Sequence, residues 1–313
     1  MDSNISTNRS FSAQGKLLLS GEYFVLDGAL ALALPARYGQ HMEISEIKSD
    51  QPILYWESLD EQGLPWLKAS FSLPQLSLLS TSDEAITKRL IQLLQKSRLQ
   101  QASFLQTTQS LKVRTTLDFP RNWGLGTSST LLYNLAQWAQ IDPYQLLADT
   151  FGGSGYDIAC AAAKGPIFYQ RIAGKANIQA IEFAPSYSHQ LYFVYLGQKQ
   201  NSREGIARYR SLLSQPTKEI EAISQITQAL SHCPQLSVFE ELLRTHEQII
   251  ASSLQIPRAR DLYFSDYWGE IKSLGAWGGD FVLATSKRSP EATQAYFADK
   301  GMKTILSYQD MVL

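Results

Sequence analysis

The sequence predicts an α/β or α+β fold in two domains, and three observations carry this prediction. The chain has 313 residues, which is too long for one small domain and suits two. Apolar residues make up 44 % of it, enough to form a sizeable core. Strand-like and helix-like patterns occur in both halves, with the break between them expected near Gln170. We therefore predict an N-terminal domain at 1–170 and a C-terminal domain at 171–313.

The N-terminal half opens with strands. Residues 16–47 carry glycines between strand-like runs, although the Ala-Leu repeat among them could also form a helix. Residues 50–82 contain several prolines and polar residues and predict a hairpin region. A helix is predicted to follow, with Ser82 or Asp83 as its N-cap. The run "SLKVRTTLDFP" predicts a strand that ends at Pro120.

The rest of the chain mixes the two patterns. The stretch "GGSGYDIACAAAKGPIFYQ" predicts a short Ala-rich helix after its glycines and a strand at 167–170. A strand is predicted in "QLYFVYLG", and residues 201–260 are predicted to be mostly helical. The stretch "KSLGAWGGDFVLATS" closes onto a further strand, and a last helix and strand follow.

Composition excludes several classes of function. The net charge is −1 and no long basic run exists, so nucleic acid is not an expected partner. No apolar run approaches the roughly 20 residues that span a bilayer, and the polar N-terminus predicts no signal peptide. Cys160 and Cys233 are too few for a disulfide framework, which favours a reducing cytoplasm. The four histidines lie far apart, so no protein-built zinc site is expected.

A glycine loop stands before the helix predicted after Pro120. Residues 124–129 read Gly-Leu-Gly-Thr-Ser-Ser and lead directly into an apolar helical pattern. A helix N-terminus suits phosphate, and glycines let the backbone approach the anion. The alternative is a serine N-cap on a helix whose core face carries Leu131, Leu135 and Trp138. Neither the Walker pattern nor the Rossmann fingerprint is met.

Two further glycine clusters raise the same question. The stretch "GGSGYD" puts Asp157 at the mouth of a helix, where an acid could steer a hydroxyl group for attack. The alternative is an ordinary carboxylate that favours the helix dipole. The stretch "GAWGGD", residues 275–280, could be a tight turn or a second backbone wall around phosphates.

The order of the motifs adds information that no single motif carries. "GKLLLSGEYFVLDG", "GLGTSS", "GSGYD" and "GAWGGD" together resemble the GHMP kinase superfamily, and within it the phosphomevalonate and mevalonate kinase branch. "LGQKQNSREGIA" and "FEELLRTHEQIIASSLQIP" are also similar, so the resemblance covers nearly the whole chain. It implies a ribosomal S5 domain 2-like N-terminal domain and a ferredoxin-like C-terminal domain, with the active site in the cleft between them.

The resemblance also implies a reaction and a set of residues. The family transfers the γ-phosphoryl group of ATP, with magnesium, to a small acceptor. Asp157 matches the catalytic aspartate, and Lys16 matches a lysine near the acceptor. Glu22, Lys199 and Ser202 match positions beside the substrate, although Glu22 could serve the fold instead. Residues expected at the nucleotide are Gly124, Leu125, Gly126, Thr127, Ser128, Ser129, Gly275, Gly278 and Gly279, with Ser128 also approaching magnesium.

Some positions depart from the family pattern. Asn122 stands where a glycine is usual, and Ser129 replaces an alanine-type residue. Trp277 replaces a glycine, and we expect it to resist positive φ and to fill space beside the phosphates. Leu146 stands where mevalonate kinases carry a magnesium glutamate, which leaves the second metal ligand unassigned and favours a phosphomevalonate-like acceptor.

Other interpretations remain open at this level. The chain could be an inactive nucleotide-binding member of the same fold, or a related diphosphomevalonate decarboxylase. Lys16, Lys199, Arg203 and Lys272 could meet in the cleft to bind an anionic acceptor, or the last three could be solvated surface charges. We expect small-molecule partners, no membrane, and a monomer or homodimer.

Overall fold

The structure, a computed structural model, describes residues 5–198, 202–214, 216–275, 277 and 279–313, without the side chains of 5–8 and 202. The chain packs as two compact units, each made of separate segments. The first unit contains Met1–Gly15, Tyr38–Arg121 and Gly126–Ala162, and the second contains Lys16–Arg37, Asn122–Leu125 and Ala163–Leu313. These units are groups of segments that pack together, whereas the predicted domains are continuous stretches of sequence. The division into 1–170 and 171–313 therefore stays a prediction.

Two long strands contribute residues to both units. They are β1 (Ile5–Ser20) and β2 (Ala31–Ile47), joined through a short helix, η1 (Phe24–Asp27). The Ala-Leu repeat is therefore a strand. Gly21 has a φ of +101°, and a Cβ there would lie 2.7 Å from the Cβ of Ala31. Only glycine fits at this position, which allows the chain to turn back on itself after β1.

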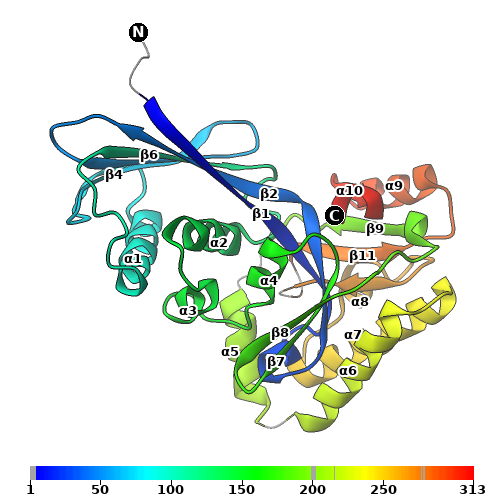
Figure 1. Cartoon of the computed structure of the whole chain (residues 1–313). Helices are drawn as coiled ribbons and strands as arrows, with labels where there is room; N and C mark the ends of the chain where they lie inside the picture. Colours follow the sequence, from blue (N-terminus) through cyan, green and yellow to red (C-terminus); the bar gives the residue numbers. More distant parts are fainter. Residues whose placement is uncertain (1–4, 199–201, 215, 276, 278) are drawn as a thin grey trace. The chain divides into compact units, whose positions relative to one another are not determined.

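The first unit is a mixed sheet with helices on one face (Figure 1). Its strand order is β5-β4-β3-β6-β2, and only the β3–β6 pair is parallel. The strands are β3 (Ile53–Leu59), β4 (Pro65–Ser72), β5 (Leu78–Thr81) and β6 (Ser110–Leu117). The helices are α1 (Glu84–Gln100), α2 (Thr127–Ala139), α3 (Pro143–Ala148) and α4 (Tyr156–Ala162).

Alternation in the sequence explains which face of this sheet is covered. In β3, Leu54 and Trp56 are buried in the main core of the unit, whereas Tyr55 between them is exposed. This period of two is the pattern of a strand with one buried face. The predicted cap of α1 is Asp83, whose carboxylate accepts a hydrogen bond from the Ile86 N–H at 3.0 Å.

The second unit contains a hairpin and a separate four-stranded sheet. The hairpin is β7 (Ile167–Ile172) with β8 (Lys175–Ala180), and β7 pairs with the start of β2. The antiparallel sheet has the order β10-β11-β9-β12, with the strands β9 (Leu191–Tyr195), β10 (Ile271–Ser273), β11 (Phe281–Thr285) and β12 (Ile305–Ser307). Every residue of β11 is buried, as a central strand requires.

Besides η1, further helical segments occur in the described part of this unit. They are η2 (Ser188–Gln190), α5 (Ser202–Leu212), α6 (Thr217–Ser231), α7 (Leu236–Leu254), α8 (Ala259–Tyr263), α9 (Pro290–Asp299) and α10 (Tyr308–Met311). The long helices α6 and α7 lie side by side (Figure 1). Residues 201–260 are thus mostly helical, as predicted. No helix in the described part of the chain is long and apolar enough to cross a bilayer.

Candidate functional site

Lys16 lies against the glycine loop. Its Nζ donates a hydrogen bond to the Gly124 carbonyl oxygen at 2.7 Å, and its backbone N–H donates to the Leu125 carbonyl oxygen at 2.9 Å. All three residues belong to the second unit. The structure therefore brings together the first two sequence motifs, which are more than 100 residues apart.

The third glycine motif reaches the same place. A Cβ on Gly275, which has a φ of +65°, would lie 3.9 Å from the Lys16 Nζ. Gly124 has a φ of +70°, and a Cβ there would lie 2.2 Å from the carboxylate carbon of Asp280, so any larger residue would displace this acid. These four residues line one narrow pocket of the second unit. Asp280 was not predicted as a site residue, although it is the last residue of "GAWGGD".

Aromatic residues hold the start of the loop. Trp123 meets Phe281 edge to face, with ring centroids 5.5 Å apart, and Tyr195 donates its hydroxyl proton to the Asn122 carbonyl oxygen at 2.9 Å. Burial, with a smaller effect of the Asp280 charge, raises the pKa of Tyr195, so this hydroxyl remains a donor. Asn122 is not one of the described residues with positive φ. An asparagine in place of glycine therefore strains nothing here.

The second half of the loop begins α2 in the first unit. Gly126 is the N-cap, with a φ of 100° and no side chain to satisfy the first N–H groups of the helix. Ser129 is buried and its Oγ donates to the Gly126 carbonyl oxygen at 2.9 Å, whereas Ser128 is exposed. The serine N-cap interpretation is therefore wrong. The helix starts at Thr127, and its first turn presents backbone N–H donors and the exposed side chain of Ser128.

The core face of α2 differs slightly from the prediction. Leu135 and Trp138 are buried as expected, but Leu132 is fully buried where Leu131 is only partly so. Asp157 lies in the first turn of α4, the helix that packs on α2 within the first unit. Its Oδ1 accepts a hydrogen bond from the Ile158 N–H at 3.0 Å. This bond orients the carboxylate at the helix start.

Glu22 is fully buried in the second unit. One carboxylate oxygen accepts from the Lys272 Nζ, and the other lies 3.2 Å from the His246 Nε2. Burial raises the pKa of Glu22, and the charge of Lys272 opposes that effect. Lys272 is itself fully buried, so the interpretation as a solvated surface charge is wrong. The prediction that Glu22 contacts the acceptor is untested, and its enclosure favours the alternative role in the fold.

Trp277 differs from what its local sequence predicts. It adopts a φ of 50° although it is bulky, and only 5 % of it is exposed. It belongs to an apolar cluster that includes Tyr23, Phe24, Tyr209 and Ile250. The expectation that it resists positive φ is therefore wrong, because burial of a large ring outweighs the backbone strain, which is of order 1–3 kcal/mol.

Comparison with known proteins identifies the fold. No protein-family model matches the chain, and no curated protein matches it. Several solved structures do match it. The mevalonate kinase of Methanococcus jannaschii is 14 % identical with a TM-score of 0.70, covering 96 % of this chain and 98 % of that one. The Streptococcus pneumoniae phosphomevalonate kinase in complex with phosphomevalonate and AMPPNP is 17 % identical with a TM-score of 0.68, covering 96 % and 99 %. The galactose-bound Lactococcus lactis galactokinase is 12 % identical with a TM-score of 0.66, covering 98 % and 94 %.

The chain has the GHMP kinase fold. This confirms the fold predicted from the four ordered motifs, and it does so without close sequence similarity. The identities fall below the level at which a substrate can be transferred from one protein to another.

The described residues offer a magnesium ion oxygen donors but no complete set of protein ligands. The described residues contain no group of three or more His, Cys, Asp or Glu side chains that could hold a metal. Leu146 is fully buried in the core and offers no ligand. Ser128 at the start of α2 and Asp157 at the start of α4 are hard oxygen donors. Such a set fits a magnesium ion that takes most of its ligands from phosphates and water.

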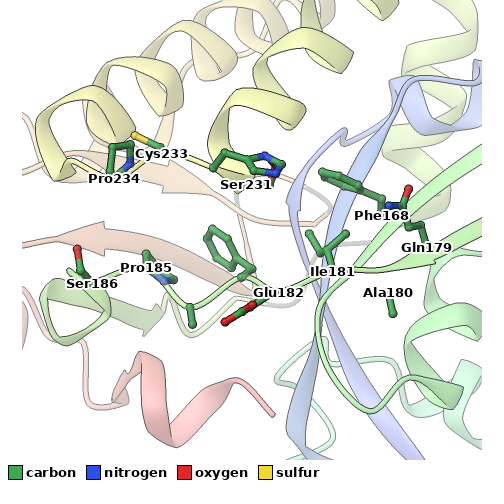
Figure 2. A pocket seen from close by; sticks show the side chains of 13 residues that line it. Phe168, Gln179, Ala180, Ile181, Glu182, Pro185, Ser186, Ser231, Cys233 and Pro234 are labelled. Atoms are coloured by element: carbon green, nitrogen blue, oxygen red, sulfur yellow. Dashed lines mark hydrogen bonds between the residues drawn. The ribbon is translucent and has the colours of Figure 1, made fainter.

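The structure describes little or nothing of three predicted site residues. Lys199 and Gly278 lie outside the described residues, and Ser202 is known only as the first residue of α5. A separate hollow of the second unit is lined by residues 179–186 and 231–234 with Phe168 (Figure 2). None of the predicted site residues lines it.

Proposed function

We propose that this chain is an ATP-dependent small-molecule kinase. The observation that carries the proposal is the hydrogen bond from Lys16 to Gly124 beside Gly275, which joins three separate motifs on a GHMP kinase fold. Phosphoryl transfer needs positioned cations and backbone donors more than covalent chemistry. A lysine held by a glycine loop is the arrangement that such a reaction uses.

The first turn of α2 is the proposed site for the nucleotide phosphates. Gly126 leaves the first N–H groups of the helix without a side-chain cap, and the helix dipole favours an anion there. Thr127 and Ser128 add hydroxyl groups, and Ser128 is exposed. Ser128, with Asp157 as a second candidate, would hold magnesium, which supplies neutralisation of the phosphate charge when bound.

Asp157 and Lys16 are the proposed catalytic residues. An acceptor hydroxyl oxygen forms a bond to the γ-phosphorus while the bond from that phosphorus to the bridging oxygen of ADP breaks. Asp157 takes the hydroxyl proton, and Lys16 stabilises the negative charge on the acceptor oxygen. If the acceptor oxygen belongs to a phosphate group, no proton has to be removed and Asp157 orients the acceptor.

The proposed acceptor is a small anion of the phosphomevalonate or mevalonate type. Phosphomevalonate kinase is among the structures that this chain resembles, and Leu146 in place of a glutamate favours a phosphomevalonate-like acceptor. The proposal includes a cytoplasmic monomer or homodimer. The chain has only two cysteines, Cys160 and Cys233, and both are buried, which a reducing compartment suits.

The test is turnover with ATP and magnesium, followed by phosphorus NMR. The acceptors are mevalonate, phosphomevalonate, galactose, homoserine and shikimate, compared by kcat/KM, with Lys16→Met as the control. We expect phosphomevalonate to be preferred. A sugar or amino acid preferred by more than about tenfold would contradict the proposed acceptor class but would leave the proposed kinase activity in place. Nucleotide binding without turnover would indicate an inactive member of the fold, and carbon dioxide released from diphosphomevalonate would indicate a decarboxylase.

A further inference from the structure

Four ionisable side chains lie together in the interior of the second unit. Glu22 follows β1, His246 and Glu247 are on α7, and Lys272 is on β10. All four are fully buried. Buried charges are costly unless they are paired, and an apolar pair of similar volume is often at least as stable. Stability alone therefore does not explain this cluster.

Its contacts join three elements of the unit. The Lys272 Nζ donates to Glu22 and to the Ser273 carbonyl oxygen at 2.9 Å. The His246 Nε2 accepts from the Gly21 N–H at 3.2 Å, and Glu247 accepts from the Ser273 N–H at 3.2 Å. The bonds to Glu22, His246 and Glu247 therefore connect the end of β1, or the end of β10, to a neighbouring element, whereas the bond to Ser273 lies within β10.

The cluster joins the end of β1 to the end of β10, and both of these strands lead to the neighbourhood of Lys16. β1 carries Lys16 six residues before Glu22, and β10 ends two residues before Gly275. Gly275 is the glycine whose Cβ would lie 3.9 Å from the Lys16 Nζ. The Glu22–Lys272 pair thus bridges the strand that carries the lysine and the turn that lies beside it.

A second connection joins the residues that follow Glu22 and Gly275. Tyr23 follows Glu22, Trp277 follows Gly275 by two positions, and both belong to the same apolar cluster. Tyr23 also has a positive φ, 62°, like Trp277. The turn is therefore held on one side by an ion pair and on the other by aromatic packing, at the cost of two strained backbone positions.

We propose that Glu22 and Lys272 are positioning residues that hold the Lys16 ammonium group at the Gly124 carbonyl oxygen and the Gly275 turn. In this proposal Glu22 acts through Lys16 and does not touch the acceptor. The consequence for turnover rests on the proposed kinase function, whereas the placement of Lys16 can be measured without it.

The experiment measures how fast an amine-selective acetylating reagent modifies Lys16 in the folded protein, by mass spectrometry. The variants are Glu22→Gln, Lys272→Met and the double variant, which buries no unpaired charge and keeps the fold testable if Lys272→Met unfolds. Loss of a charge-assisted hydrogen bond at Lys16 should raise its modification rate by about tenfold or more. The folded double variant should show the same rise.

Glu270→Gln is the matched control. Glu270 is also a buried carboxylate of the second unit, paired to α7 through Arg244 at 2.8 Å, but it lies before β10 and away from the turn. It should lose stability without changing the modification of Lys16. A folded double variant with wild-type modification of Lys16 would overturn the proposal. If the wild type transfers phosphate, kcat should fall in the double variant with little change in the KM for ATP. If it does not, the modification rates still decide the matter.

Discussion

Replacing Glu247 by glutamine should change how the stability of this protein depends on pH. Glu247 is fully buried beside Lys272, Glu22 and His246, and its carboxylate accepts from the Ser273 N–H. Burial is the main cause that raises its pKa from an ordinary value of 4.5 to about 8, and the charge of Glu22 adds to it. Glutamine keeps the shape and the acceptor oxygen but cannot ionise.

The sign and size of the effect follow from proton binding. Between pH 4.5 and 8 the native carboxyl holds a proton that the unfolded chain has released. The stability that this proton provides is complete below pH 4.5 and is lost as pH rises through 8, at about 1.4 kcal/mol per pH unit. From pH 5.5 to 7.5 the wild type should lose roughly 2–3 kcal/mol through this group. The Glu247→Gln variant should not.

Urea unfolding followed by circular dichroism at several pH values measures this difference. The free energy of unfolding of the variant, minus that of the wild type, should rise with pH and level off above about pH 8. Glu241→Gln is the control, because Glu241 is an exposed carboxylate on the same helix. A difference that stays constant from pH 5.5 to 7.5 would refute the protonation assigned to Glu247.

Three further predictions concern the proposed active site. Gly124→Ala should lower transfer activity by at least about tenfold, since its Cβ would lie 2.2 Å from the Asp280 carboxylate carbon. Gly63→Ala, which has a similar positive φ and open space around it, should leave activity unchanged, and equal losses in the two would reject the steric argument. Ser128→Ala should lower turnover at limiting magnesium by about tenfold, a barrier change of about 1.4 kcal/mol, and unchanged kinetics there would remove Ser128 from the metal site. Asp157→Asn should keep ATP affinity, measured by calorimetry, and lose roughly 10²-fold in turnover with a hydroxyl acceptor such as mevalonate, so a folded variant with full activity on that acceptor would exclude proton transfer to Asp157.

Local patterns predicted most of the elements, because helix caps and periodicity act over a few residues. Asp83 was one of two predicted caps of α1, and the structure selects it. The order of the glycine motifs predicted the fold. It also placed Lys16 and Gly275 among the site residues, and the structure brings them together.

Features that depend on distant residues were not predictable. The partner of Lys272 is 250 positions away, and an isolated lysine in a sequence normally indicates a solvated surface. Trp277 has a backbone conformation that its own side chain disfavours, and only the cluster around it stabilises that conformation. The cap of α2 was missed because serine is a favoured cap, whereas here a glycine with positive φ takes the position.

The interleaving of the two units has a consequence for folding during synthesis. All segments of the first unit lie within residues 1–162, so it can fold while the rest of the chain is still being translated. Residues 16–37 emerge early but belong to the second unit, whose remaining segments come mostly after residue 162. Until those residues arrive, the apolar Leu17 and Leu18 of β1, which are buried in the complete protein, lack most of the second unit around them. Chaperone dependence should therefore be greatest for nascent chains that contain the first unit alone.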